Sequence, residues 1–551
     1  MNVNERNNTS GIRIWTPFLL GLAAAGGMLV GMRMNSPAPS VQWIDANKDI
    51  PASTIGRGRV EEIIRYIEAK YVDDVDSDKM VNSAIAKLIH DLDPHSNYIP
   101  AAELKEINEQ LEGSFDGIGI EYMILDDTIV VVTPLSGGPS EAAGILVGDK
   151  IIRIKDSLVA GVGIDNVGIM KQLRGEAGTE VDVSIKRAGE KKLKKFTITR
   201  DKIPNKSVDV AYMLEDNIGL IKINRFSAQT YEEFMAGVEE LSNAGMENLV
   251  IDLRHNPGGY LQEATQMLSQ LFKEKGLLLV YTEGEHVSRT DYTSDGRPFF
   301  KIEQIAVLID EGSASASEIM AGAIQDHDRG WLIGRRSFGK GLVQEQYVLK
   351  DGSALRLTVA RYYTPSGRSI QKDYADKEGY DRDVFDRFET GELLSADSIP
   401  TPDSLEFYTD LGRKVYGGGG IVPEIFVPLD TVTMHEDYIR LRRFIPQFTF
   451  RYNDGHPELA ETDFADFKRT FKADGEAWTE FLAYAAEREE SFTAEDAVDP
   501  QVVRELQLFL KARMAKLLYG DKEMYAVLNE GDAMVKEALR VLRARKPIVA
   551  N

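Results

Sequence analysis

Strand-like and helix-like segments alternate between residues 208 and 428, and this alternation most constrains the fold. NIGLIKINRF is typical of a strand, and the helical pattern TYEEFMAGVEELSNAG follows it. The buried-type strand pattern NLVIDLR, the helical LQEATQMLSQLF and the strand pattern IAVLID come next. Strands and helices that alternate in this way predict an α/β core.

The stretch DEGSASASEIM carries three serines just before a helical pattern. A serine attacks a carbonyl well only when a base removes its proton. His327 lies on the same predicted helix as Ser315 but about 18 Å further along, so it cannot touch that hydroxyl. His255 follows a predicted strand, and a Ser-His-Asp site that uses it stays open as an alternative. The residues alone do not decide which of the three serines is the nucleophile.

Lys340, in SFGKG, is the better candidate for the base. A lysine in water has a pKa of about 10.4 and is charged. Burial among apolar groups removes water from the amine and lowers its pKa, so that it accepts a proton near neutral pH. The flanking glycines leave the amine room in a tight site. A solvated surface charge is the alternative role for a single lysine.

Residues 112–200 indicate a β-rich module. IGIEYMI and TIVVVTPL flank Asp126 and Asp127, which suits a hairpin turn, and GTEVDVSIKR and KKFTITR supply two more strands. Together with FDGIGIEY and PSEAAGILVGDKI, these segments resemble a PDZ domain. In such domains a glycine-containing loop offers backbone N–H groups to the terminal carboxylate of a peptide, which adds as a strand to the sheet edge. The resemblance places this loop at Gly117, Ile118, Gly119 and Ile120, although the two glycines alone would also serve a strand bend.

SASASE, FGKG and LVQ occur in order, and the chain from Arg59 to Pro428 resembles the C-terminal processing peptidases, or tail-specific proteases. The resemblance implies a crotonase-like α/β core that carries an inserted PDZ domain. It also implies a Ser-Lys dyad, with the nucleophile at Ser315 and the base at Lys340. Gln344 matches a glutamine that positions the lysine, and Asp326 matches a supporting acid. No metal or organic cofactor is implied.

The backbone around Ser315 offers a way to hold an oxyanion. Ser315 and Glu318 fit a capping box, which predicts that Ser315 lies at a helix N-terminus, where the helix dipole favours negative charge. The backbone N–H of Ala316 is then one oxyanion donor. RHNPGG resembles the family's other oxyanion segment and indicates Gly258 as the second donor, with Gly259 next; an ordinary turn is the alternative.

The segment 14–32, IWTPFLLGLAAAGGMLVGM, carries no charge. About 19 residues make roughly 28 Å of helix, close to the thickness of a hydrocarbon core. It predicts a transmembrane signal anchor between a cytoplasmic tail at 1–13 and a linker at 33–57, with a cleaved signal peptide as the alternative. We therefore expect a single-pass protein of the bacterial inner membrane with its catalytic part in the periplasm, or secretion to the periplasm if the signal is cleaved.

Residues 430–551 change character and predict an acidic helical C-terminal domain. VVRELQLFLKARMAKLLYG places Leu506, Leu510 and Leu517 on one helical face. This domain offers a surface for an oligomer or an adaptor and indicates no chemistry. The formal net charge of −23 argues against nucleic acid, because phosphate binding needs clustered Lys and Arg. The chain has no cysteine, which excludes disulfides and thiolate nucleophiles.

The predicted layout is completed by an N-terminal helical region at 58–111, the PDZ domain, and a Ser-Lys peptidase core at 201–429. We expect a serine endopeptidase that binds the C-terminal tails of exported proteins and cleaves them through an acyl-enzyme. A non-catalytic PDZ scaffold that binds protein C-termini at the membrane is one alternative. An acyl-CoA-type hydratase or isomerase on the same core is another.

Overall fold

The computed structural model describes residues 57–545, apart from 401–404, 490 and 495–497, together with residue 548. The described chain falls into two compact units. The small unit contains the helices up to residue 89, the strand at 97–100 and the segment 345–357, and the large unit contains the remaining residues.

The small unit combines two helices with a short antiparallel pairing. Its helices are α2 (Arg57–Lys70) and α3 (Ser77–His90), and its first strand is β1 (Asn97–Ile99). This strand pairs antiparallel with the first residues of β18 (Ala354–Tyr363). Ile99 is fully buried there, whereas Val60, Ile63 and Tyr66 on α2 are exposed.

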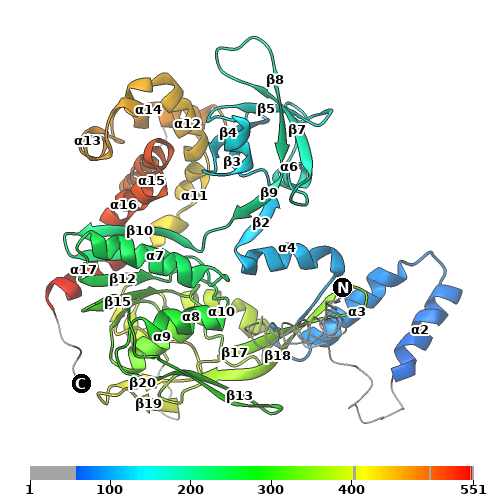
Figure 1. Cartoon of the computed structure of the whole chain (residues 1–551), viewed down its shortest axis with the longest axis vertical. Coiled ribbons are helices and arrows are strands. Elements are labelled where there is room, and N and C mark those ends of the chain that lie inside the picture. Colours follow the sequence, from blue (N-terminus) through cyan, green and yellow to red (C-terminus); the bar gives the residue numbers. More distant parts are fainter. Residues whose placement is uncertain (1–56, 401–404, 490, 495–497, 546–547, 549–551) are drawn as a thin grey trace, which may run out of the picture. The chain divides into compact units, whose positions relative to one another are not determined.

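The β module of the large unit is a twisted antiparallel sheet with two short helices (Figure 1). The strands run in the order β3-β4-β5-β7-β8, and β3 and β4 form the predicted hairpin, with Asp126 and Asp127 at positive φ in its turn. Side chains such as Ile129, Ile151 and Val183 make its core. Its elements, with the helix that precedes them, are α4 (Ala101–Glu112), β2 (Ser114–Gly117), β3 (Ile120–Leu125), β4 (Thr128–Pro134), α5 (Pro139–Ala143), β5 (Lys150–Ile154), β6 (Ser157–Leu158), α6 (Asn166–Leu173), β7 (Glu180–Lys186), β8 (Lys194–Thr199) and β9 (Asp201–Pro204).

A six-stranded sheet, which we call the core sheet, carries the centre of the large unit. Five of its strands are parallel and the edge strand β10 is antiparallel. Its strands are β10 (Val208–Glu215), β11 (Ile218–Ile223), β12 (Asn248–Asp252), β15 (Ile305–Ile309), β16 (Trp331–Gly334) and β21 (Ile425–Phe426). The mixed α/β fold predicted from the alternating segments is confirmed.

Helices bury both faces of the core sheet, which explains why its strands are almost continuously apolar. On one face, Ile251 and Val307 pack with side chains of α7 (Thr230–Asn243), α8 (Leu261–Ser269) and α9 (Ala316–Asp326). On the other face, Val250 and Leu308 pack with side chains of α17 (Ala533–Arg543). The C-terminal helix is therefore a layer of the central fold.

A second sheet and an irregular segment complete this part of the large unit. β13 (Leu278–Gly284) pairs with β14 (Val287–Thr293) and with the last residues of β18. The remaining elements are β17 (Leu342–Val348), α10 (Lys377–Glu389), η1 (Ala396–Ser398), β19 (Glu406–Tyr408) and β20 (Lys414–Tyr416).

The C-terminal helices have an aromatic-rich core of their own, to which Phe448, Phe481 and Leu510 belong. Gln447 of this group donates to the carbonyl oxygen of Ile124 on β3, at a distance of 2.9 Å. The elements are η3 (Thr431–Met434), α11 (Glu436–Arg442), α12 (Ile445–Gly455), η4 (Pro457–Glu461), α13 (Phe464–Thr470), α14 (Glu476–Ala486), α15 (Pro500–Tyr519), α16 (Asp521–Gly531) and α17.

The expected anchor at 14–32 lies outside the described residues. Within the described ranges, no helix combines the length and the apolar character needed to cross a bilayer. This finding contradicts the predicted single-pass inner-membrane protein with a periplasmic catalytic part, and we withdraw that localisation.

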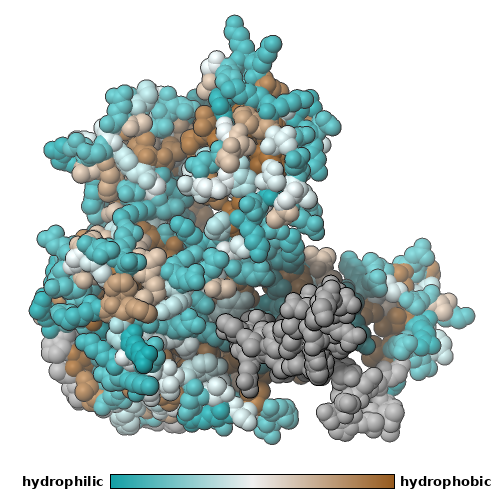
Figure 2. All heavy atoms as spheres, in the orientation of Figure 1, coloured by the Kyte–Doolittle hydropathy of each residue, from teal (hydrophilic) through white to brown (hydrophobic). Residues whose placement is uncertain are grey.

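Polar residues predominate on the face shown in Figure 2, in keeping with the excess of acidic side chains.

Candidate active site

The structure separates the roles of the three serines. The hydroxyl of Ser313 donates to the carbonyl oxygen of Leu253 (2.8 Å), and that of Ser317 donates to the carbonyl oxygen of Asn256 (2.9 Å). Both serines are fully buried. Their hydrogen bonds tie residues 313–317, which we call the serine loop, to the segment after β12. Ser315 is half-buried and has φ 55° and ψ −113°, which non-glycine residues rarely adopt. Backbone strain of this kind clusters at functional sites, and it distinguishes Ser315 from its neighbours.

Glu318 joins the serine loop to residues 337–340, which we call the lysine loop. One of its carboxylate oxygens accepts from the backbone N–H groups of both Ser315 (2.9 Å) and Lys340 (2.8 Å). The other oxygen accepts from the Ser337 hydroxyl (2.5 Å) and from the Gly339 N–H (2.7 Å). Burial raises the pKa of Glu318 to about 7, although these hydrogen bonds act against the rise. The contact with the Ser315 N–H is the Glu318 half of the predicted capping box. The other contacts of Glu318 are not needed to cap a helix, and they bind the lysine loop.

Lys340 and Gln344 are in direct contact. The amine of Lys340 donates to the Gln344 side-chain oxygen (3.1 Å), and the Gln344 amide nitrogen donates to the carbonyl oxygen of His95 (2.6 Å). Because its nitrogen is engaged, the Gln344 amide keeps its oxygen toward Lys340. Burial, together with the nearby charge of Lys340, lowers the pKa of His95 to about 4. The sequence did not indicate His95 as a site residue. Its ring nitrogen Nε2 lies 2.6 Å from the hydroxyl oxygen of Tyr380.

Tyr362 bridges the same two loops from the other side. Its hydroxyl is in hydrogen-bond contact with the carbonyl oxygens of Ser315 (3.0 Å) and of Lys340. The side chain is fully buried, and burial raises the pKa of Tyr362 well above its usual value. The hydroxyl is therefore neutral, and the backbones of Ser315 and Lys340 are held from two directions.

The glycines of RHNPGG lie directly against Ser315. A Cβ atom on Gly258 would lie 2.6 Å from the Cβ of Ser315 and 2.9 Å from the backbone nitrogen of Ala316, so only glycine fits there. The Gly258 N–H donates to the side-chain oxygen of Asn256 (2.9 Å). Gly259 follows with φ 147°, and a Cβ atom on it would collide with the backbone of Phe226. The segment lies against Ser315, and the Gly258 N–H is directed at Asn256, so the oxyanion role of Gly258 stays a prediction.

Two other candidate residues have ion-pair partners of their own. Asp326, at the far end of α9, forms a buried ion pair with Arg368 (2.7 Å), so it supports the helix end. His255 pairs with Asp310 (3.0 Å), and its side chain is 78% exposed. The hydrogen bond to Asp310 raises the pKa of His255.

The predicted carboxylate-binding loop, Gly117–Ile120, connects β2 to β3, the last strand of its sheet. The carbonyl oxygen of Ile118 accepts from both the N–H (3.0 Å) and the hydroxyl (2.6 Å) of Ser140. Gly119 has φ 70°, which favours glycine. The loop is thus packed against the start of α5, and it leads into a strand at the end of the sheet.

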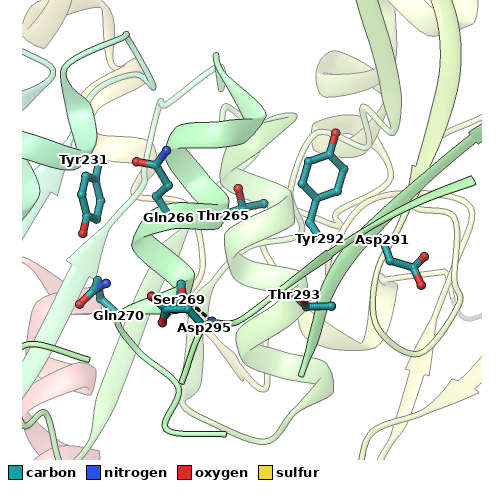
Figure 3. A pocket seen from close by; sticks show the side chains of 9 residues that line it. All are labelled: Tyr231, Thr265, Gln266, Ser269, Gln270, Asp291, Tyr292, Thr293 and Asp295. Carbon is teal, nitrogen blue, oxygen red and sulfur yellow. Dashed lines mark hydrogen bonds between the residues drawn. The ribbon is translucent and has the colours of Figure 1, made fainter. Parts of the chain in front are cut away.

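A pocket of about 440 Å³ lies between α7, α8 and β14 (Figure 3). Tyr231, Ser269 and Asp295 line it, and the Ser269 hydroxyl donates to Asp295 (2.9 Å). Its lining contains neither Ser315 nor Lys340. In the part of the chain that the structure describes, no three His, Asp or Glu side chains form a group that could hold a metal ion.

Comparison with known proteins gives two family matches. Residues 217–384 match the model of peptidase family S41, and residues 437–520 match a family of unknown function. The chain is 38% identical over 324 residues to a carboxy-terminal-processing protease of Bartonella bacilliformis, which covers 57% of this chain and 72% of that protein. It is 37% identical over 314 residues to a probable CtpA-like serine protease of Staphylococcus aureus (strain N315), covering 57% of this chain but only 62% of that relative.

Among solved structures, the photosystem II D1 C-terminal processing protease is 31% identical to this chain, with a TM-score of 0.31. The match covers 56% of this chain and 83% of that protease's chain. The family assignment therefore depends on the sequence matches. The S41 segment, residues 217–384, includes every residue from Ser315 to Gln344. The chain belongs to the carboxy-terminal-processing proteases of peptidase family S41.

Proposed function

We propose that the protein is a serine endopeptidase that cleaves the C-terminal tails of other proteins, with Ser315 as nucleophile and Lys340 as general base. The observation that carries this proposal is the shared Glu318 oxygen, which accepts from the backbone nitrogens of both residues. A nucleophile and its base must lie within hydrogen-bond reach, and this contact holds their backbones together. We further propose that the core sheet and its helices form a crotonase-like core.

In the proposed reaction the uncharged amine of Lys340 takes the hydroxyl proton as the Ser315 oxygen bonds to the scissile carbonyl carbon. The C–N bond then breaks, and Lys340 gives the proton to the leaving amine. Water attacks the resulting ester with Lys340 again as base, and the released fragment ends in a carboxylate. Gln344 accepts one N–H of Lys340 and so orients the amine. The scheme needs no metal or organic cofactor.

The oxyanion of each tetrahedral intermediate needs two donors at the start of α9. The Ala316 N–H is the first, because Ala316 begins this helix immediately after Ser315. For the second we now prefer Gly259 to Gly258, because the Gly258 N–H is already bonded to Asn256. Glycine at both positions permits the close approach that a substrate carbonyl requires.

The β module is the proposed PDZ domain, and its role is to capture the substrate tail. The loop Gly117–Ile120 would bind the terminal carboxylate through its N–H groups, and the tail would add as a strand along β3. β3 is suited to this role because it lies at the end of the sheet order.

One experiment tests the whole proposal. The full chain is incubated with a carrier protein that ends in an apolar tail, in parallel with the variant Ser315→Ala, and intact masses are measured. Loss of tail mass with the unmutated chain alone supports the endopeptidase. Tail binding without any mass loss in either sample would favour the non-catalytic scaffold, and turnover of an enoyl-CoA in place of the tail would favour the hydratase.

A further inference from the structure

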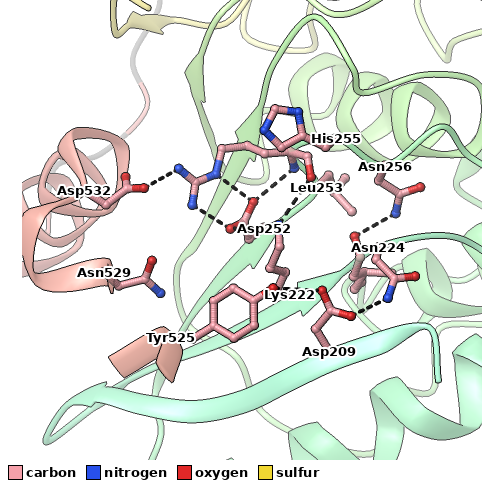
Figure 4. A network of polar contacts seen from close by, with 12 residues as sticks. Asp209, Lys222, Asn224, Asp252, Leu253, His255, Asn256, Tyr525, Asn529 and Asp532 are labelled. Carbon is pink, nitrogen blue, oxygen red and sulfur yellow. Dashed lines mark hydrogen bonds and ion pairs between the residues drawn. The ribbon is translucent and has the colours of Figure 1, made fainter. Parts of the chain in front are cut away.

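Arg254, the first residue of RHNPGG, forms ion pairs with Asp252, two residues before it, and with Asp532 of the C-terminal helices. Figure 4 labels both aspartates. Its guanidinium donates to Asp252 through two nitrogens (2.9 and 2.7 Å) and to Asp532 through the third (2.5 Å). The Arg254 side chain is only 16% exposed, and that of Asp252 is 1% exposed. Ion pairs shielded from water in this way are strong only when every partner is present.

Both carboxylates hold Arg254 in its charged form. Burial alone would lower the pKa of Arg254, but the charges of Asp252 and Asp532 raise it above the usual range. Burial would likewise raise the pKa of Asp252, yet Arg254 and Lys222 hold it well below its ordinary value. Removing one carboxylate would therefore leave a buried charge with incomplete compensation.

Asp532 is itself fixed by the fold. One of its oxygens accepts from the N–H of Val535 (2.9 Å) and caps α17, and the other accepts from Arg254. The helix is anchored because Met534, Val535 and Ala538 are buried against the core sheet. Nearby, Asn529 donates to the hydroxyl of Tyr212 on β10 (2.7 Å), which fastens α16 to the same sheet.

The segment that begins at Arg254 is hydrogen-bonded to the loop that carries Ser315. Asn256 lies two residues further on, and its amide donates to the carbonyl oxygen of Ile223 (2.9 Å). The backbone oxygen of Asn256 accepts from the Ala314 N–H (3.0 Å) and the Ser317 hydroxyl, and its side-chain oxygen accepts from the Gly258 N–H. The position of Arg254 thus sets where the glycines lie relative to Ser315.

We infer that Asp532 is a positioning residue of the active site, which acts through Arg254 on the oxyanion loop 254–259. The C-terminal helices are on this view part of the catalytic machinery, since they supply one of the two carboxylates that hold the loop. The inference rests on the proposed function. A displacement of the oxyanion donors by about 1 Å lowers the rate about 100-fold, and the loss of one anchor is expected to lower kcat by about 10- to 100-fold.

The test compares Asp532→Asn with Glu215→Gln in the full chain. Asparagine caps helices as well as aspartate does, so α17 keeps its cap while Arg254 loses a charge partner. Glu215 pairs with Arg543 and also joins α17 to β10, but at an exposed position away from the loop. The expected result for Asp532→Asn is a lower kcat with an unchanged KM and a lower Tm, because the largely buried Arg254 loses a charge partner. Glu215→Gln should keep the kcat of the unmutated chain.

A second measurement, hydrogen exchange of the amides of residues 254–259, separates this inference from the proposed function. Faster exchange in Asp532→Asn than in Glu215→Gln supports the positioning role even if the unmutated chain cleaves no tail, in which case only the proposed function fails. Equal exchange in the two variants, or an equal fall in kcat, would overturn the inference.

Discussion

Ser315 and Lys340 present their backbone nitrogens to the same carboxylate oxygen of Glu318, at 2.9 and 2.8 Å. A single acceptor cannot serve both donors unless the two loops are adjacent. The Tyr362 hydroxyl makes the corresponding contact with the carbonyl oxygens of the same two residues. The proposed dyad is therefore held through its main chain, while the Lys340 amine donates to Gln344.

Replacing the proposed base tests the dyad directly. Lys340→Met keeps an unbranched side chain but has no group to accept the serine proton, and kcat for tail cleavage should fall by about 10²–10⁴-fold. The exposed Lys414, which pairs with Glu406, provides the matched control Lys414→Met. Intact-mass kinetics give both rates. Undiminished turnover in Lys340→Met would remove Lys340 from the mechanism.

Glu318→Gln should separate the two loops. The amide nitrogen of glutamine would replace an oxygen that now accepts from two donors, which leaves buried groups unsatisfied and costs about 1–3 kcal/mol of stability. We expect a lower Tm together with a large loss of kcat. Glu303→Gln, at a more exposed position beside Lys301, should change neither. Unaltered kinetics in Glu318→Gln would show that the shared acceptor has no part in catalysis.

The pKa of Glu318 also predicts a pH dependence of stability. Its folded value of about 7 lies above the ordinary 4.5, so between these pH values the folded state binds more protons than the unfolded state. The contribution is fully present below pH 4.5 and is lost as pH rises to 7, on the order of 3 kcal/mol. The difference in unfolding free energy between the unmutated chain and Glu318→Gln, from denaturant titrations, should fall across this range. A constant difference would contradict the raised pKa.

Tyr362→Phe removes one hydroxyl and nothing else. The single O–H proton is shared between the carbonyl oxygens of Ser315 and Lys340, so its loss should lower stability by about 1 kcal/mol. The rate constant kcat should fall about 10-fold as the loops loosen. Tyr363→Phe is the matched control, because the neighbouring ring stacks on Tyr281. Thermal unfolding and tail-cleavage kinetics give the two values. If both variants behave alike, the bridge made by the Tyr362 hydroxyl is unimportant.

Tail capture can be tested at a glycine of the loop. In Gly119→Ala the new methyl group must occupy a residue with φ 70° and would lie 3.1 Å from Ile203. Gly161→Ala carries the same backbone strain at φ 72° but has open space around it. Fluorescence polarisation of a labelled apolar tail peptide should show weaker binding only for Gly119→Ala, with KM raised and kcat little changed. Equal affinities would place tail binding elsewhere.

The sequence predicted the α/β fold and a hairpin at Asp126 because both follow from local patterns. The choice among the three serines came only from the family resemblance, since their difference lies in backbone torsion and in partners such as Leu253. His95 and Tyr362 approach Lys340 from remote parts of the chain, and no spacing reveals such a contact.

The C-terminal helices show the same limit of sequence reasoning. Their apolar stripes predicted a buried face but could not say what would cover it. The structure places α17 on the core sheet and Asp532 beside Arg254. The hydrogen bond that the Gly258 N–H donates to the Asn256 side chain was equally hidden, because it depends on a side-chain rotamer in a loop.

α17 follows every strand of the core sheet along the chain, and its buried side chains pack with Val250 and Leu308 on one face of that sheet. During synthesis, Val250 and Leu308 gain these contacts only after residue 533 and its successors have left the ribosome. A nascent chain that already contains Ser315 and Lys340 still exposes part of the apolar face that α17 covers. It also lacks Asp532, the second carboxylate partner of Arg254. The order of the elements thus separates the synthesis of the proposed dyad from that of the helix that anchors its loop.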